Sequence, residues 1–236
     1  MRKKLYITIA VLVIAAALLL FLRQFSSARS FQAFGTIVDR VETSRKIVAL
    51  TFDDGPTPEV TRPLLDLLEK EQVRATFFVT GAELEKQMNL GIRIAAMGHE
   101  LGNHSYSHTR MIFVTPSFVQ SEIERTDALI REAGYQNPIH FRPPYGKKLF
   151  VLPYYLSQNG RTTVTWDIEP DSNTRATAGD IAREAVEQTR PGSIILLHVM
   201  YANRVESFKA VGKITNDLKA NGYEFVTVSE LMSAAQ

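Results

Sequence analysis

From Lys46 onward, short runs of β-branched, aromatic and other apolar residues alternate with longer segments of helical spacing. The runs lie at 47–52, 75–79, 99–102, 139–141, 162–166, 193–197 and 223–228. This alternation, with short connections, favours parallel strands joined by helical crossovers. About seven such units in roughly 190 residues predict an α/β fold, a small, deformed and incomplete (β/α) barrel of parallel strands rather than an open doubly wound sheet.

The segments between the runs carry the signals of helices. Leucines at 64, 65, 67 and 68 mark one apolar face, and apolar residues at 118, 123, 129 and 130 mark another. Glycines stand where four of these helices would end before the next strand, at Gly98, Gly134, Gly160 and Gly222. We therefore expect helix ends at these four glycines.

The first 28 residues differ from the rest of the chain. Basic residues at 2–4 precede an uncharged apolar run of 18 residues at 5–22. That length is near the lower limit for a membrane-spanning helix and exceeds the ~7–15 residues of a usual signal-peptide core. We expect a retained signal anchor at 1–28, an N-terminal transmembrane helix with its basic flank in the cytoplasm and the remaining chain outside the cell membrane. Ser26-Ser27-Ala28 also fits a small-x-small cleavage site, and cleavage there would release a secreted protein.

Composition narrows the possible partners and metal ligands. Four of the 27 Lys and Arg residues and none of the 25 Asp and Glu residues lie in 1–28, which leaves 23 basic against 25 acidic side chains outside the anchor. A near-neutral outer domain argues against nucleic acid as a partner. The chain has no cysteine, so any bound metal must be held by His, Asp or Glu. Residues 29–45 show weak strand patterning and no recognisable chemistry, and we expect a stalk that partly packs on the domain.

Polar clusters follow the carboxyl ends of five predicted strands, the place where (β/α) barrels put their active sites. They are TFDDGP at 51–56, NHSYSH at 103–108, FRPPYG at 141–146, WDIEPD at 166–171 and the histidine that ends IILLH at 194–198. Taken singly, each has an ordinary explanation as a solvated turn or a structural histidine. Taken together, they would meet at one face of a barrel, which predicts an active site there.

Two of the clusters have the composition of a metal site. The adjacent carboxylates Asp53 and Asp54 leave a strand in different directions, so one can bind a metal while the other lies beside it. His104 and His108, spaced i and i+4, would share one face of a helical turn. Two histidines and one carboxylate with open positions suit a catalytic divalent ion, zinc or a similar metal.

The other three clusters offer supporting groups. Prolines fix the 142–146 loop, which can aim backbone N–H groups at an oxyanion, while Arg142 can hold a carboxylate. One of the three acids in 167–171 can orient a histidine, and His198 is expected near the barrel mouth. His99 and His140 precede or begin their strands, so we expect both to be structural.

In this order, the clusters closely resemble the motifs of the polysaccharide deacetylases of carbohydrate esterase family 4, the NodB-homology domain. The resemblance spans roughly 46–232. TFDDGP and H-S-x-x-H match fully, R-P-P-Y-G matches the usual R-x-P-x-G, and I-L-L-H matches the last motif. The resemblance implies a deformed (β/α) barrel and a catalytic domain at 46–236 that removes N-acetyl groups from an amino-sugar polymer, with peptidoglycan expected and chitin-like oligosaccharides as the other candidate.

The resemblance also assigns roles to individual residues. It implies a metal, commonly zinc, on Asp54, His104 and His108. Asp53 would be the general base and His198 the general acid, while Arg142 keeps Asp53 ionised. The backbone N–H of Tyr145, in a substrate-binding loop with Pro144 and Gly146, would help to stabilise the oxyanion.

One motif departs from the family pattern, and two other functions stay open. The family often shows D-x-x-D-W after the fifth strand, whereas this run is one residue longer and lacks that Trp. Either Asp167 or Asp171 could hold His198, with a slight preference for Asp171, and we expect Trp166 to lie in the core. The alternatives are an inactive glycan-binding wall protein with the same fold and a metal-dependent amidase that acts on a non-sugar acyl amide.

Overall fold

The computed structural model describes residues 2–235, and its centre is the buried strand β2 (Ile47–Asp53). All pairings in this sheet are parallel, and β2 pairs with three neighbours. The sheet runs in the order β4 (Glu100–Asn103), β3 (Thr76–Val79), β2 and β6 (Ile194–Leu197), and β7 (Glu224–Val226) pairs with the first half of β2. All seven residues of β2 are buried, as expected of a parallel strand covered on both faces.

Short pairings connect the remaining strands to this sheet. β1 (Ile37–Val38) and β5 (Thr163–Val164) form a parallel pair. Single bridges join Phe141 to both Asn103 and Thr163, and another joins Ile168 to Ile195 of β6. The strands thus form an irregular ring, with single bridges where a regular barrel would have continuous ladders. The predicted α/β class with parallel strands is confirmed.

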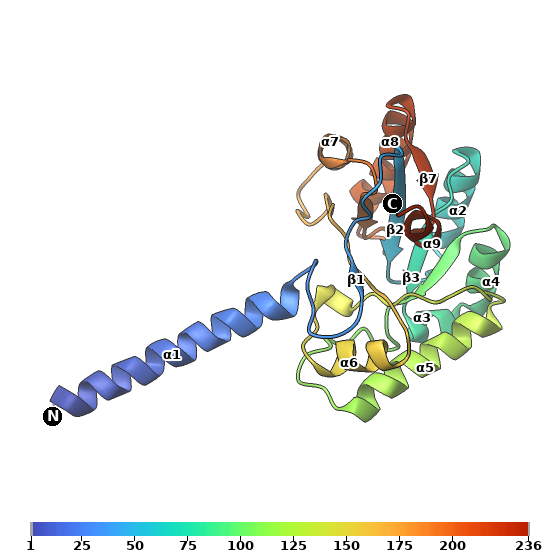
Figure 1. Ribbon diagram of the computed structural model, residues 1–236. Coiled ribbons are helices and arrows are strands. Elements are labelled where there is room, and N and C mark those ends of the chain that lie inside the picture. The colour runs from blue at the N-terminus through green and yellow to red at the C-terminus, as the bar shows by residue number, and fades with distance from the viewer. Residues whose placement is uncertain (1, 236) are drawn as a thin grey trace.

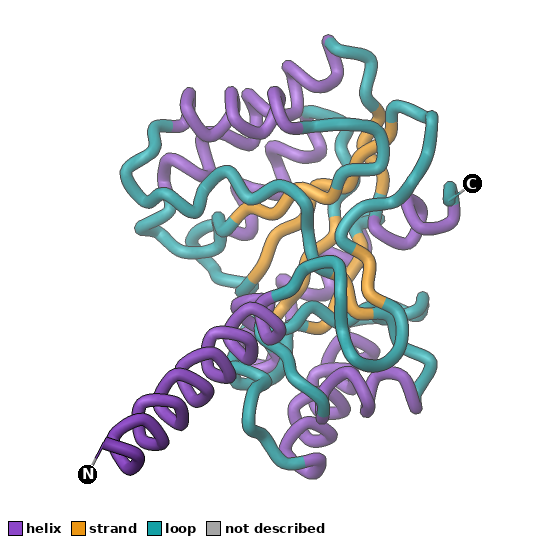
Figure 2. Tube along the Cα trace, turned by 60° about the vertical axis from the view of Figure 1, so that its left-hand side comes forward, coloured by secondary structure: helices purple, strands orange, loops and turns teal. Residues whose placement is uncertain are grey.

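Helices lie on both sides of the strands (Figures 1 and 2). They are α2 (Thr61–Lys70), α3 (Gly81–Lys86), α4 (Met88–Ala96), α5 (Pro116–Glu132), α6 (Val151–Gln158), α7 (Ala178–Gln188), α8 (Val205–Ala220) and α9 (Val228–Ser233). The leucine face predicted for α2 is buried at Leu64, Leu65 and Leu68 in the main core. The four glycines expected at helix ends follow α4, α5, α6 and α8 and have φ values of 79°, 91°, 61° and 80°, the left-handed conformation that ends helices.

Three predicted strands differ from the observed ones. The run at 139–141 contributes only the two single bridges at Phe141, because Pro138 and Pro143 flank it and supply no N–H donors for a longer ladder. The run at 162–166 is shortened to β5, and the run at 223–228 is shortened to β7. β1 lies inside the segment expected to be a stalk, which packs on the domain through β5.

The N-terminal helix α1 (Arg2–Ser27) projects away from the rest of the molecule (Figures 1 and 2). Within residues 2–235 it is the one helix long and apolar enough to cross a membrane, with a mean hydropathy of 2.9 over its most apolar window. A signal sequence and a retained anchor share these properties. Only the carboxyl end of α1 contacts the domain, where the ring of Phe25 lies 5.5 Å from that of Phe150.

Candidate metal centre and active site

Loops at the carboxyl ends of β2, β4, β5 and β6 surround a cavity of about 510 Å³. Seven residues predicted from the sequence line it: Asp53, Asp54, His104, His108, Tyr145, Gly146 and His198. Seven others complete the lining: Ser27, Arg29, Lys147, Trp166, Glu169, Ser172 and Arg204. The structure therefore brings residues of all five sequence clusters to one face, together with the chain that follows α1.

Asp54, His104 and His108 form a compact ligand set. Their ligand atoms lie within 4.8 Å of one another. Asp54 Oδ1 is 3.3 Å from His108 Nε2 and 4.0 Å from His104 Nε2. Among the described residues this oxygen is buried without a hydrogen-bond partner, and a cation bound there would satisfy it. One carboxylate and two imidazoles fit a divalent metal ion with open coordination positions.

The two histidines are positioned by an irregular loop, so the predicted helical turn at 104–108 is wrong. Ser105 and His108 have positive φ values of 65° and 57°, which no α-helix contains. The loop is held from outside, because Glu122 of α5 accepts hydrogen bonds from the N–H groups of Tyr106 and Ser107. The i, i+4 spacing still brings the ligands together, with ring centroids 5.0 Å apart.

Protonation of the two imidazoles is set by their surroundings. His104 Nδ1 lies 2.7 Å from the carbonyl oxygen of Arg142. Because a carbonyl only accepts, Nδ1 carries the proton, which leaves Nε2 free to bind a metal. Burial and the neighbouring His104 lower the pKa of His108, which favours the neutral imidazole that a metal requires.

Asp53 lies beside the ligand set and is paired with a buried arginine. Arg142 Nη1 donates to Asp53 Oδ1 at 2.7 Å and to Thr51 Oγ1 at 2.8 Å, and its Nη2 donates to the carbonyl of Thr165. Burial alone would raise the pKa of Asp53, but Arg142, His104 and His198 outweigh it and hold that pKa below its ordinary value. Asp53 is therefore an ionised carboxylate next to the candidate metal, able to accept a proton.

His198 faces the cavity from the end of β6 and is held by Asp171. His198 Nδ1 lies 3.3 Å from Asp171 Oδ1, and the backbone N–H of His198 donates to Asp171 Oδ2 at 2.7 Å. Burial would lower the pKa of His198, but its hydrogen bond to Asp171 and the charges of Asp53, Asp171 and Asp54 raise it to about 9. This imidazole is therefore protonated at neutral pH and can act as a proton donor.

Asp167, the other carboxylate considered for His198, lies elsewhere. Its Oδ1 accepts from the N–H of Ile194 at 2.8 Å and its Oδ2 accepts from Ser193 Oγ at 2.9 Å. The bridge between Ile168 and Ile195 fixes this register and places Asp167 at the entry of β6, at the opposite end of that strand from His198. The structure thus places Asp171, and not Asp167, in contact with the histidine.

The 142–146 loop turns sharply at the cavity edge. Tyr145 has a φ of 58° and an exposed side chain whose ring lies 4.7 Å from that of His108. Gly146 has a φ of 64°, and a Cβ there would approach the ring of Trp166 to 3.3 Å. Pro144 is buried and is not one of the described residues that line the cavity. The loop presents Tyr145 to a ligand and packs Gly146 against Trp166.

Some residues of the cavity wall were not predicted from the sequence. Trp166 belongs to a core cluster, as expected, but it also lines the cavity, and its indole N–H donates to Glu169 at 2.9 Å. Ser27 and Arg29 come from the end of α1 and the segment after it, a region without any chemical motif. Only the fold brings that segment to the site, so no local pattern could have identified it.

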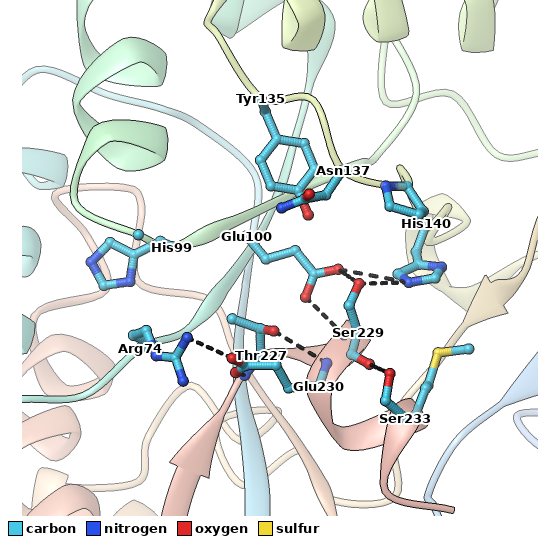
Figure 3. A pocket seen from close by; sticks show the side chains of 13 residues that line it. Arg74, His99, Glu100, Tyr135, Asn137, His140, Thr227, Ser229, Glu230 and Ser233 are labelled. Atoms are coloured by element: carbon cyan, nitrogen blue, oxygen red, sulfur yellow. Dashed lines mark hydrogen bonds and ion pairs between the residues drawn. The ribbon is translucent and has the colours of Figure 1, made fainter.

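A second cavity of about 560 Å³ lies on the amino-terminal side of β3 and β4 (Figure 3). Although it is slightly larger, its polar groups are satisfied by each other. The carboxylate of Glu100 accepts from the N–H and hydroxyl of Ser229, and His140 Nε2 lies 3.0 Å from the same hydroxyl. His99 Nδ1 accepts from a backbone N–H, and burial lowers the pKa of this neutral histidine to about 4. His99 and His140 thus occupy structural positions away from the candidate metal centre.

Comparison with known proteins adds four findings. The family model for polysaccharide deacetylase matches residues 40–164. A peptidoglycan-N-acetylglucosamine deacetylase of Bacillus cereus is 36% identical over 191 residues, which cover 80% of this chain and 69% of the relative. The peptidoglycan-N-acetylmuramic acid deacetylase PdaC of Bacillus subtilis is 33% identical over 82% of this chain and 40% of its own length. A crystal structure of a peptidoglycan N-acetylglucosamine deacetylase superposes with a TM-score of 0.79 and 32% identity, over 84% of this chain and 92% of that one.

Proposed function

The chain belongs to the polysaccharide deacetylase family, and we propose that it removes N-acetyl groups from peptidoglycan by metal-assisted hydrolysis. The observation that carries the proposal is that Asp53 and His198 line the same cavity as the ligand set Asp54, His104 and His108. An ionised base and a protonated acid around one metal position match amide hydrolysis. Peptidoglycan is the substrate named for both relatives described above.

The chemistry supplied by a divalent ion on this ligand set, for which we propose zinc, is activation of water and polarisation of the acetamide carbonyl. On this proposal, Asp53 takes a proton from the attacking water, and Arg142 keeps its carboxylate ionised and correctly oriented. His198 gives a proton to the departing sugar amine, with Asp171 orienting its ring. The products are acetate and a free amine. The backbone N–H of Tyr145 would stabilise the oxyanion formed at the carbonyl.

Asp171→Asn tests the role of His198. Since Asp171 contributes to raising the pKa of His198, its neutralisation should lower that pKa. The protonated acid would then be lost at lower pH, so the alkaline limb of the kcat profile should move toward neutral pH and kcat should fall by roughly 10²-fold. A pH–rate profile of kcat measures both effects, and an alkaline limb at its original position would exclude Asp171 as the group that positions His198.

We also propose that α1 is a retained single-pass anchor and that the domain after it lies outside the cell membrane. The basic flank at 2–4 and the apolar helix support this orientation. A reporter that is active only outside the cytoplasm, fused after Ser30, should be active and remain in the membrane fraction. Activity of a cytoplasmic reporter at the same position would exclude this topology, and recovery of the active fusion in the medium would show that the signal is cleaved.

Acetate release by the full chain in detergent separates the proposed function from its alternatives. The substrates would be peptidoglycan, neutral N-acetylglucosamine oligomers and non-sugar acetamides, each with added metal. We expect acetate from peptidoglycan and slower release from the other two. Faster release from non-sugar amides would favour the amidase, and glycan binding without hydrolysis would favour the inactive wall protein.

A further inference from the structure

The chain that follows α1 is built into the active-site wall, although it lies outside the family match at 40–164. We call residues 26–31 the juxtamembrane segment. The backbone N–H of Lys148 donates to the carbonyl of Ser26 at 3.0 Å, and the hydroxyl of Thr165 donates to the carbonyl of Arg29 at 2.6 Å. The buried ammonium of Lys148 also donates to the carbonyl of Ala28. These contacts fix the backbone of the segment from Ser26 to Arg29.

Arg29 is the charged residue that this segment contributes to the cavity. Its guanidinium carbon lies 4.7 Å from the centroid of the Trp166 ring, and its Nη2 donates to Glu169 Oε2 at 2.6 Å. Trp166 donates to the same carboxylate oxygen. The cation–π contact and the ion pair hold the guanidinium against the cavity wall. Its side chain stays 42% exposed, so N–H groups beyond the one used by Glu169 remain for a ligand.

Three basic side chains, Arg29, Lys147 and Arg204, line the cavity together with the carboxylates of Glu169, Asp53 and Asp54. Glu169 is paired with Arg29, and Asp53 is paired with Arg142. A metal on Asp54, as proposed above, would offset the charge of that carboxylate, so the basic side chains would be in excess in the metal-bound site. A negatively charged group on a bound glycan would therefore be attracted to this cavity.

We propose that Arg29 is a substrate-binding residue that favours carboxylate-bearing N-acetylated glycan over neutral oligomers. The inference rests on the proposed function and deepens it, because it names the carboxylate as the feature of the substrate that the cavity recognises. A guanidinium suits a carboxylate, with which it forms paired hydrogen bonds. In peptidoglycan that carboxylate belongs to the peptide stem where a stem is attached, because the attachment converts the lactyl carboxyl of muramic acid into an amide. Where the stem is absent, the lactyl group itself carries the carboxylate, so strands with and without peptides present the two sources separately.

The test compares the full-length chain with Arg29→Gln in detergent. Substrates are peptidoglycan strands with peptides, the same strands without peptides, and neutral N-acetylglucosamine oligomers of equal length. For the carboxylate-bearing strands we expect KM to rise about 10-fold in the variant with kcat within about 2-fold, and we expect little change for the neutral oligomer. A KM effect on the peptide-bearing strands alone identifies the stem carboxylates, one on the peptide-free strands alone identifies the lactyl carboxylate, and an effect on both shows that either carboxylate is accepted. Arg45→Gln, which removes the same charge at an exposed position outside the cavity, should change neither KM.

Two further measurements do not depend on this one variant. Arg29→Lys keeps the charge and should recover part of the lost affinity for anionic strands. Added salt should raise the KM of the unaltered chain for anionic strands and leave that for neutral oligomers unchanged. The role of Arg29 would be overturned if the Arg29→Gln variant raised KM equally for charged and neutral substrates, or if the KM of the unaltered chain for anionic strands did not change with salt. In both cases continued acetate release would leave the proposed function standing. If the unaltered chain released acetate from none of the glycans, the proposed function would fail as well.

Discussion

His104→Ala should lose bound metal and acetate release together. The substitution removes one of the three proposed metal ligands, and this is the one whose ring is fixed by the Arg142 carbonyl. With only Asp54 and His108 left, metal affinity should fall by at least ~10²-fold, and turnover should drop by ~10³-fold or more because water is no longer activated. Metal content per chain and acetate release, measured on the same preparation, test this result.

The matched control is His140→Ala. It also removes one buried imidazole, but from the cavity on the amino-terminal side of β3 and β4 (Figure 3). That variant should keep its metal and its turnover, while the loss of the hydrogen bond to Ser229 lowers its melting temperature. Full metal occupancy in His104→Ala would remove this residue from the proposed ligand set.

Asp53→Asn should keep the metal and lose turnover. The amide has nearly the same shape and its oxygen can still accept from Arg142, but it cannot take a proton from water. We expect kcat to fall by roughly 10³-fold, within the range found for general bases, with a much smaller change in KM. Steady-state kinetics and metal analysis of the variant provide the measurement.

Stability has to be followed in the same experiment, because Arg142 is fully buried and would lose its anionic partner. Breaking such a pair costs about 3–5 kcal/mol, so thermal unfolding must show that the variant is folded at the assay temperature. Asp66→Asn makes the same chemical change at an exposed carboxylate of α2 and should leave kcat and metal content unchanged. Turnover above about a tenth of the original in a folded Asp53→Asn chain would exclude Asp53 as the base.

The sequence predicted the site because its residues occur at positions that the fold makes equivalent. Asp54, His104 and His198 each follow the carboxyl end of a strand, and the parallel sheet brings these ends to one edge. The alternation of strands and helices, together with the glycines after four helices, was sufficient to establish the α/β class. These features are local, so they can be read without knowledge of tertiary contacts.

Features that depend on distant contacts could not be predicted. β1 exists because it pairs with β5, far along the chain. The loop at 104–108 is irregular because Glu122 of α5 binds its backbone N–H groups, so the spacing of the histidines was correct but the predicted helical turn was not. Arg29 reaches the cavity only because Lys148 and Thr165 hold its segment. In each case the deciding interaction joins residues that no window of sequence contains.

The most direct test of the central claim is acetate release from peptidoglycan by the full-length chain before chelation, after chelation and after a divalent metal is restored. We expect acetate in equal amount to newly exposed sugar amines, loss of release when the metal is removed from the proposed ligands Asp54, His104 and His108, and recovery when it returns. Undiminished release from a sample shown to be free of metal would contradict the central claim.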